Sequence, residues 1–124
     1  KALVGNIKTY KDLLIWQKGI ELVKFTYKIC QDFPKDEVFG LQSQIKRSSV
    51  SVPSNIAEGY GRQSTKSYLQ FVKIARGSLL ELETQLIIAK ELNFVNQSNF
   101  DKMSELIVEE SKMINAFIRS VEKN

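Results

Sequence analysis

Histidine is absent from this 124-residue chain, and cysteine occurs only once, at Cys30. Without histidine, the chain lacks the commonest general base and zinc ligand, and also the Glu-x-x-His pairs on which di-iron helical bundles depend. A lone cysteine cannot form an intramolecular disulfide, and its place in an apolar stripe favours a buried thiol and a reducing cytoplasm. Gly-rich phosphate-binding loops are missing too, and no serine has an obvious activating partner. We therefore expect a non-enzymatic protein with no metal site and no cofactor.

Proline and glycine are also scarce, with two and six residues, and no segment is rich in serine and glycine. This composition predicts neither a linker nor a disordered tail, so residues 1–124 are expected to form a single domain. No apolar run approaches the ~20 residues that cross a bilayer, and the first residues lack the pattern of a secretion signal. We expect a cytoplasmic protein without a membrane partner.

Charge is unevenly distributed along the chain, although the formal net charge is only +4. Residues 1–45 hold seven bases and five acids, residues 46–76 hold six bases and one acid, and residues 77–124 hold five bases and eight acids. The basic middle segment can attract phosphate or an acidic partner. The commoner meaning of scattered lysine and arginine is a hydrated helix face.

Apolar residues recur at steps of three and four in four segments, which predicts four amphipathic helices. The first has Thr9 and Asp12 as a capping pair and ends near Asp32, before Pro34. Its predicted core stripe is Leu13, Trp16, Ile20, Val23, Tyr27 and Cys30. A second stripe holds Ile15, Leu22, Phe25 and Ile29, which exceeds what one intramolecular core demands and predicts self-association.

The second helix, at about 40–58, has an inward seam of unusually small and polar residues. Such a seam lets a neighbouring helix approach closely. Pro53 removes one backbone donor and crowds the carbonyl of Ser49, so a kink is expected there.

The third and fourth helices have the most regular apolar spacing. Ser64 is the predicted N-cap of the third, and Ser98 with Asp101 has the spacing of a capping box for the fourth. Glu110 falls inside the apolar stripe of the fourth helix. Short connections at 59–62 and 93–97 predict antiparallel neighbours. The expected fold is an all-α, up-down-up-down four-helix bundle.

Basic residues of the middle segment form the candidate nucleic-acid contact. Four of them recur at steps of four, seven and three, close to one line along the start of the third helix, and two precede them on the second. Such a row can contact successive phosphates without reading sequence. It can equally keep a bundle face hydrated, or pair with acids of a neighbouring subunit. The six residues are Lys46, Arg47, Arg62, Lys66, Lys73 and Arg76.

Several segments resemble the four-helix-bundle proteins named for the intervening sequence of 23S ribosomal RNA. They are residues 39–41, 44–47, 51–59 (Ser-Val-Pro-Ser-Asn-Ile-Ala-Glu-Gly), 74–79 (Ile-Ala-Arg-Gly-Ser-Leu) and 81–86 (Glu-Leu-Glu-Thr-Gln-Leu). The resemblance covers nearly the whole chain. It implies a bacterial bundle without established enzymatic activity, and homopentamers are known in that family. Its name records a genomic location inside a ribosomal RNA gene.

The motif residues have two interpretations that the sequence does not separate. Small residues would let the second and third helices approach, with the polar ones tying them together, or the same group could line a polar cleft. The carboxylates alone could serve acid–base chemistry or hold a hard cation, although hydrogen bonding within the fold is the simpler role. The group comprises Ser51, Pro53, Asn55, Glu58, Gly59, Gly77, Ser78, Glu81 and Glu83.

Two functions follow from these patterns. The first is a self-assembling bundle that binds RNA or DNA, ribosomal RNA included, through its basic surface. The second is a protein-interaction or scaffold module with no nucleic-acid role. An unrecognised enzyme or metal-binding protein that uses Glu58, Glu81 and Glu83 ranks third.

Overall fold

The structure, a computed structural model, describes residues 6–123, and these contain helices and no strand. The elements in chain order are η1 (Tyr10–Asp12), α1 (Leu14–Cys30), η2 (Lys35–Glu37), α2 (Leu41–Tyr60), α3 (Thr65–Glu91) and α4 (Gln97–Glu122). No helix in this part of the chain is long and apolar enough to cross a membrane.

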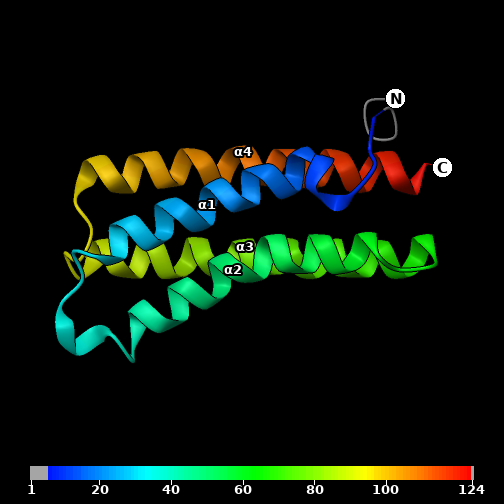
Figure 1. Cartoon of the computed structure of the whole chain (residues 1–124). Helices are drawn as coiled ribbons and strands as arrows, with labels where there is room; N and C mark the ends of the chain where they lie inside the picture. Colours follow the sequence, from blue (N-terminus) through cyan, green and yellow to red (C-terminus); the bar gives the residue numbers. More distant parts are fainter. Residues whose placement is uncertain (1–5, 124) are drawn as a thin grey trace.

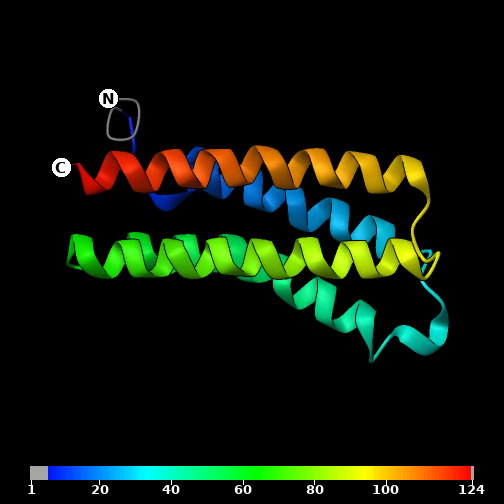
Figure 2. The ribbon, with the colours of Figure 1, turned by 180° about the vertical axis from the view of Figure 1, so that it is seen from behind.

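The four long helices run alternately up and down, side by side, in one bundle (Figure 1). Each packs on its neighbours in the chain, and α1 also packs on α4, which closes the arrangement. Consequently α1 lies diagonally opposite α3, and α2 opposite α4. Seen from behind, α3 and α4 lie in front of α2 and α1 (Figure 2). The predicted antiparallel four-helix bundle is confirmed.

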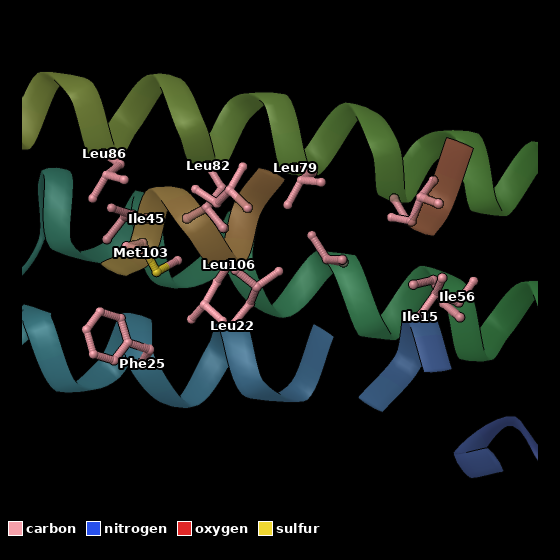
Figure 3. Close-up of a cluster of buried hydrophobic side chains, with 14 of the residues drawn as sticks. Ile15, Leu22, Phe25, Ile45, Ile56, Leu79, Leu82, Leu86, Met103 and Leu106 are labelled. Carbon is pink, nitrogen blue, oxygen red and sulfur yellow. The ribbon is translucent and has the colours of Figure 1, made fainter. Parts of the chain in front are cut away.

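The core fills the space between all four helices with aliphatic side chains (Figure 3). Leu22 of α1, Ile45 of α2, Leu82 of α3 and Met103 of α4 are completely buried. Burying a side chain of this size stabilises a fold by ~1.5–3 kcal/mol, so apolar packing along the bundle axis supplies the main favourable term.

The sequence prediction of the core face of α1 was right only in part, because Leu13 and Cys30 are buried as expected whereas Trp16, Ile20 and Val23 are half-buried. Ile15, Leu22, Phe25 and Ile29 are buried, whereas the predicted core residue Tyr27 is 44% exposed. Because this stripe lies inside the bundle, it is no basis for self-association. Gly19 explains which face of α1 is buried. It belongs to the buried stripe, and a Cβ there would lie 3.1 Å from Pro53 Cβ. The close approach of α1 to α2 therefore needs this face inward.

Helix starts follow local capping chemistry, with two differences from the prediction. Ser64 Oγ accepts from the N–H of Ser67 and caps α3, as expected. The Thr9–Asp12 capping box caps η1 instead of α1. At α4 the predicted Ser98 cap is wrong, because Asn96 is the N-cap and its Oδ1 accepts from Asn99 N at 2.8 Å.

Helix ends also differ slightly from the prediction. The α2 helix continues through Pro53 to Tyr60, two residues beyond the expected end, and a kink at the proline stays a prediction. The α3 helix ends at Glu91, and Asn93 adopts the left-handed conformation (φ 64°) that asparagine tolerates better than most residues.

Candidate functional site

The seam between α2 and α3 is built from small hydroxyl and amide side chains. Ser51 and Ser78 share a hydrogen bond of 2.8 Å across the two helices. Asn55 Nδ2 donates to the carbonyl and to the Oγ of Ser51, at 2.8 and 2.9 Å. Three residues before Ser51 on α2 and seven residues after Ser78 on α3, Ser48 Oγ donates to Gln85 Oε1 at 2.6 Å. These polar groups use one another as partners, so they hold the two helices together at close range.

The two motif glycines have opposite environments. A Cβ at Gly59 would lie 2.9 Å from Phe71 Cβ and 3.0 Å from the carbonyl oxygen of Tyr68, so only glycine allows α2 to approach α3 here. Gly77 was expected to serve the same approach. It instead faces outward, and a Cβ there would meet no atom within 4 Å. That part of the packing interpretation is wrong, because Gly77 occupies an exposed position of α3 and does not contact α2.

The three motif carboxylates do not converge on one point. Glu58 is exposed and pairs with Arg62 at 3.0 Å, one turn ahead on the same chain segment. Glu81 accepts from Gln85 Nε2 at 3.4 Å on the α2 side of α3, whereas Glu83 lines a hollow between α3 and α4. Within residues 6–123, no group of three His, Cys, Asp or Glu side chains is placed to hold a metal ion.

The six basic candidates lie on two helices and the turn between them, and their contacts face different sides of the bundle. Lys46 lies over the ring of Tyr27 on α1, with its Nζ 4.7 Å from the centroid. Lys73 of α3 pairs with Glu122 of α4 at 3.1 Å, and Arg76 of α3 donates to Asn115 Oδ1 of α4 at 3.0 Å. The α1/α2 seam and the α3/α4 seam lie on opposite sides of the bundle, so the structure separates these bases.

The remaining basic candidates are bound locally or stand free in solvent. Arg62 precedes α3, where its guanidinium lies 4.4 Å from the centroid of the Phe71 ring. Arg47 donates to Ser43 Oγ at 3.3 Å on its own helix. Lys66 is exposed at the start of α3. Because Lys66, Lys73 and Arg76 all lie on α3, a phosphate contact along this helix stays a prediction.

Glu110 is the residue whose environment the sequence analysis missed. Its side chain is completely buried in the core, and neither carboxyl oxygen has a hydrogen-bond partner. Its Oε2 would lie 3.4 Å from a Cβ on Gly19, so the carboxyl points at the place where α1, α2 and α4 meet. Burial raises the pKa of Glu110 to about 9, against a smaller opposing effect of Lys18. The sequence signal for this environment is the position of Glu110 inside the apolar stripe of the fourth helix.

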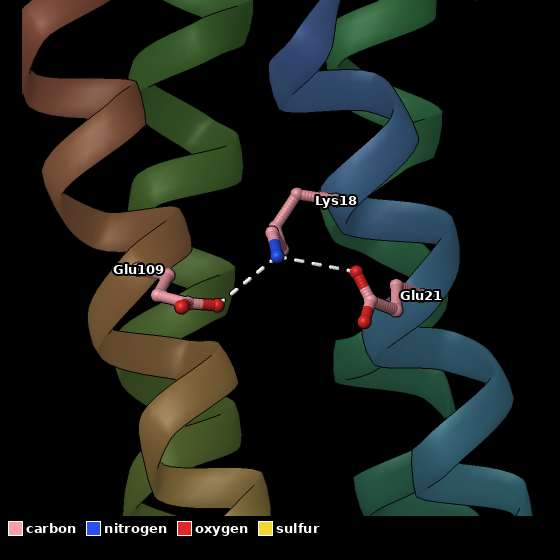
Figure 4. Close-up of polar contacts among 3 residues, drawn as sticks. All are labelled: Lys18, Glu21 and Glu109. Carbon is pink, nitrogen blue, oxygen red and sulfur yellow. Dashed lines mark hydrogen bonds and ion pairs between the residues drawn. The ribbon is translucent and has the colours of Figure 1, made fainter.

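Lys18 does not form an ion pair with Glu110, because its ammonium group pairs with two other acids near the surface. Its Nζ lies 3.0 Å from Glu109 and 3.2 Å from Glu21, in a bridge that joins α1 to α4 (Figure 4). These two partners raise the pKa of Lys18, Glu109 more than Glu21. The buried carboxyl is consequently protonated near neutral pH.

Exposed apolar side chains gather on the outward side of α3. Between 74 and 92 the exposed positions hold five large aliphatic residues and two acids, with no base. Leu80 is the most exposed of the five, at 61%. We call this surface the outer face of α3. It comprises Ile74, Gly77, Leu80, Glu81, Thr84, Ile87, Ile88, Glu91 and Leu92.

These features define a four-helix bundle with a hydrogen-bonded α2/α3 seam, one buried acid and an uncovered apolar face. The sequence matches the family described as 23S rRNA-intervening sequence protein over residues 11–116. The chain belongs to this family, and the resemblance inferred from the sequence is confirmed.

One solved structure of similar fold is a protein of unknown function from the S23 ribosomal protein family of Bacteroides thetaiotaomicron. Its TM-score is 0.79 and its sequence identity 20%, and the match covers 86% of this chain and 96% of that one. At this identity the likeness supports the fold alone. No curated protein matches this sequence.

Proposed function

We propose that this protein is a non-enzymatic bundle that assembles with copies of itself and acts as a scaffold. The outer face of α3 is the observation that carries the proposal. The solvent side of a helix in a monomeric bundle is normally polar, whereas this face presents five large aliphatic side chains within five turns. A contiguous apolar surface of this kind is typical of an interface between proteins.

The non-enzymatic part of the proposal rests on the residue types and their placement. The chain has no histidine, its motif residues Ser51 and Ser78 bond to each other across the α2/α3 seam, and Asn55 bonds to Ser51 within α2. Neither carboxyl oxygen of the buried acid Glu110 has a hydrogen-bond partner among residues 6–123. A homopentamer, which the family resemblance implies, and a cytoplasmic location stay predictions.

Light scattering of the purified protein over a range of micromolar concentrations tests self-assembly. The wild type should have a mass of several 14.2 kDa chains. Leu80→Lys, at the centre of the outer face, should lower the average mass because it places a charge in the apolar contact. Leu14→Lys is a matched control, since Leu14 is equally exposed but lies on α1. A monomeric wild type throughout the range would contradict the proposal.

A second candidate function is binding of RNA or DNA without sequence preference. The observation in its favour is the excess of five positive charges between residues 46 and 76, with Lys66 and Arg47 exposed. Lys66, Lys73 and Arg76 all lie on α3, so this helix would carry the contact, and an assembly of several copies would add their bases to it.

A titration of labelled ribosomal RNA at several salt concentrations tests this second function. Reversing Lys66, Lys73 and Arg76 to glutamate should weaken binding and flatten its salt dependence. Reversing Lys24, Lys35 and Lys112, which lie outside the basic segment, is the control of equal charge. Equal losses from both sets, or no binding near physiological salt, would exclude a specific basic surface.

A further inference from the structure

A second apolar surface lies over the seam between α1 and α2. It is a shallow hollow of about 480 Å³, lined on its apolar side by Tyr27, Val38, Phe39 and Val50. Phe39 is 97% exposed, which is exceptional for an aromatic residue. The segment 35–41 that carries it projects from the body of the bundle in both views of the chain (Figures 1 and 2). We call this surface the α1/α2 hollow.

The hollow and the outer face of α3 together contain nearly all the exposed apolar bulk of residues 6–123. Eleven large hydrophobic residues are exposed in this part of the chain, and nine of them belong to these two surfaces. Only Leu14 and Val108 lie elsewhere. Scattered single residues would need no explanation, but this concentration at two places indicates two contact surfaces.

Charges distinguish the two surfaces and make them complementary. The lining of the hollow includes two bases, Lys46 and Arg47, and no acid. The exposed positions of the outer face include two acids, Glu81 and Glu91, and the one base at its edge, Lys73, is paired with Glu122. Two copies of either surface would bring like charges together, whereas the hollow against the outer face pairs apolar with apolar and base with acid.

A molecule cannot join its own two surfaces, because α1 and α3 are diagonal in the bundle and do not touch. We infer that the outer face of α3 of one copy seats in the α1/α2 hollow of the next, so that copies join head to tail. This inference rests on the proposed self-assembly and specifies its interface. A head-to-tail contact leaves one free surface at each end and therefore grows until a ring closes or a filament forms.

Mixing two variants, each with one surface disabled, tests this arrangement. Phe39→Ser removes the exposed ring from the hollow, and Leu80→Lys places a base in the outer face. Each change should raise the dissociation constant at least about tenfold, which is the loss of ~1.4 kcal/mol. Each variant alone should then be monomeric near the midpoint concentration of wild-type assembly.

An equimolar mixture of the two variants should form a complex of two 14.2 kDa chains and stop there. The Phe39→Ser chain keeps its outer face and the Leu80→Lys chain keeps its hollow, so one intact contact remains. Native mass spectrometry resolves this species, and circular dichroism checks that both variants are helical. A mixture that stays monomeric, or variants that still assemble alone, would overturn the head-to-tail interface while leaving self-assembly standing. A monomeric wild type would overturn the proposed function itself.

Charge reversal gives an independent check that does not depend on apolar contacts. Lys46→Glu with Arg47→Glu, or Glu81→Lys with Glu91→Lys, should weaken assembly because each set brings like charges together. A chain with all four reversals should assemble as the wild type does, since the attraction is restored with opposite signs. If the fourfold variant assembles no better than its parents, the charges do not face each other and the inference is wrong.

Discussion

At the scale of single residues, Glu110 has the most unusual environment. An ionised carboxylate without partners is expensive in a protein interior, so the group keeps its proton when the chain folds. Burial raises its pKa from 4.5 to about 9, and the bundle tolerates it as a neutral acid. Charged residue types are rarely fully buried without a partner, so Glu110, whose carboxyl oxygens make no hydrogen bond, is expected to reduce the stability of the bundle.

The pH dependence of stability should reveal this acid. Between its unfolded and folded pKa values, the folded state holds the proton and the unfolded state has lost it. The contribution of Glu110 is therefore most favourable at low pH, and stability falls as pH rises, by up to about 1.4 kcal/mol per pH unit. Glu110→Gln should remove this dependence and be more stable than the wild type at about pH 8. Urea unfolding at several pH values measures it, and equal slopes for both proteins would contradict the assignment.

Two glycines offer a matched pair of substitutions at the same scale. Gly77→Ala should stabilise α3 by up to ~1 kcal/mol, because alanine is the better helix former and no atom crowds the new Cβ. Gly59→Ala should destabilise the bundle by roughly 1–3 kcal/mol, because its Cβ would meet Phe71 and the backbone of Tyr68. Both are best measured by urea unfolding of Leu80→Lys chains, in which assembly does not contribute. A Gly59→Ala chain as stable as its parent would show that the seam does not need Gly59, and a destabilising Gly77→Ala would contradict the outward position of Gly77.

At the scale of elements, the contact between α2 and α3 has a polar centre within an apolar core. Ser51 accepts a hydrogen bond from Asn55 Nδ2, and its hydroxyl shares a second hydrogen bond with the hydroxyl of Ser78. A buried hydroxyl that loses its partner costs more than the bond itself contributes. The two helices therefore depend on the whole group.

A double-mutant cycle on this pair gives the element-scale prediction. Ser51→Ala and Ser78→Ala should each cost about 0.5–1.5 kcal/mol, with Ser51→Ala the larger because it also removes one of the two acceptors of Asn55. The double variant should lose less than the sum, since the shared bond is lost only once. Strict additivity of the unfolding free energies would show that the two hydroxyls do not interact.

The face of α1 shows what apolar spacing can and cannot predict. Two stripes compete on this helix, and both satisfy the periodicity of an amphipathic helix. The stripe of Leu22 lies inward because Gly19, in the same stripe, allows Pro53 of α2 and Glu110 of α4 to come close. The length and position of the helix could be predicted, but its rotation depends on partners distant in the sequence.

At the scale of the whole molecule, self-assembly should couple stability to concentration. If assembly stabilises the folded chain, the Tm of the wild type should rise by several degrees over a hundredfold increase in protein concentration. The Tm of Leu80→Lys should stay nearly constant, because the outer face of α3 no longer makes its contact. Differential scanning fluorimetry at several concentrations measures both proteins. A wild-type Tm independent of concentration would contradict coupled assembly.

The sequence by itself determined the helical class, the number of helices, the Ser64 cap and the family, because apolar periodicity, capping and motif residues are local properties. It also placed Glu110 in an apolar stripe, although it did not show that the acid lacks a partner. Only the tertiary structure decided which face of α1 is buried, that Gly59 packs while Gly77 faces outward, and that Lys46 lies on a different side of the bundle from Lys73 and Arg76. The reason is physical: each of these depends on how the helices rotate against one another, and that rotation is set by the best fit of four surfaces at once.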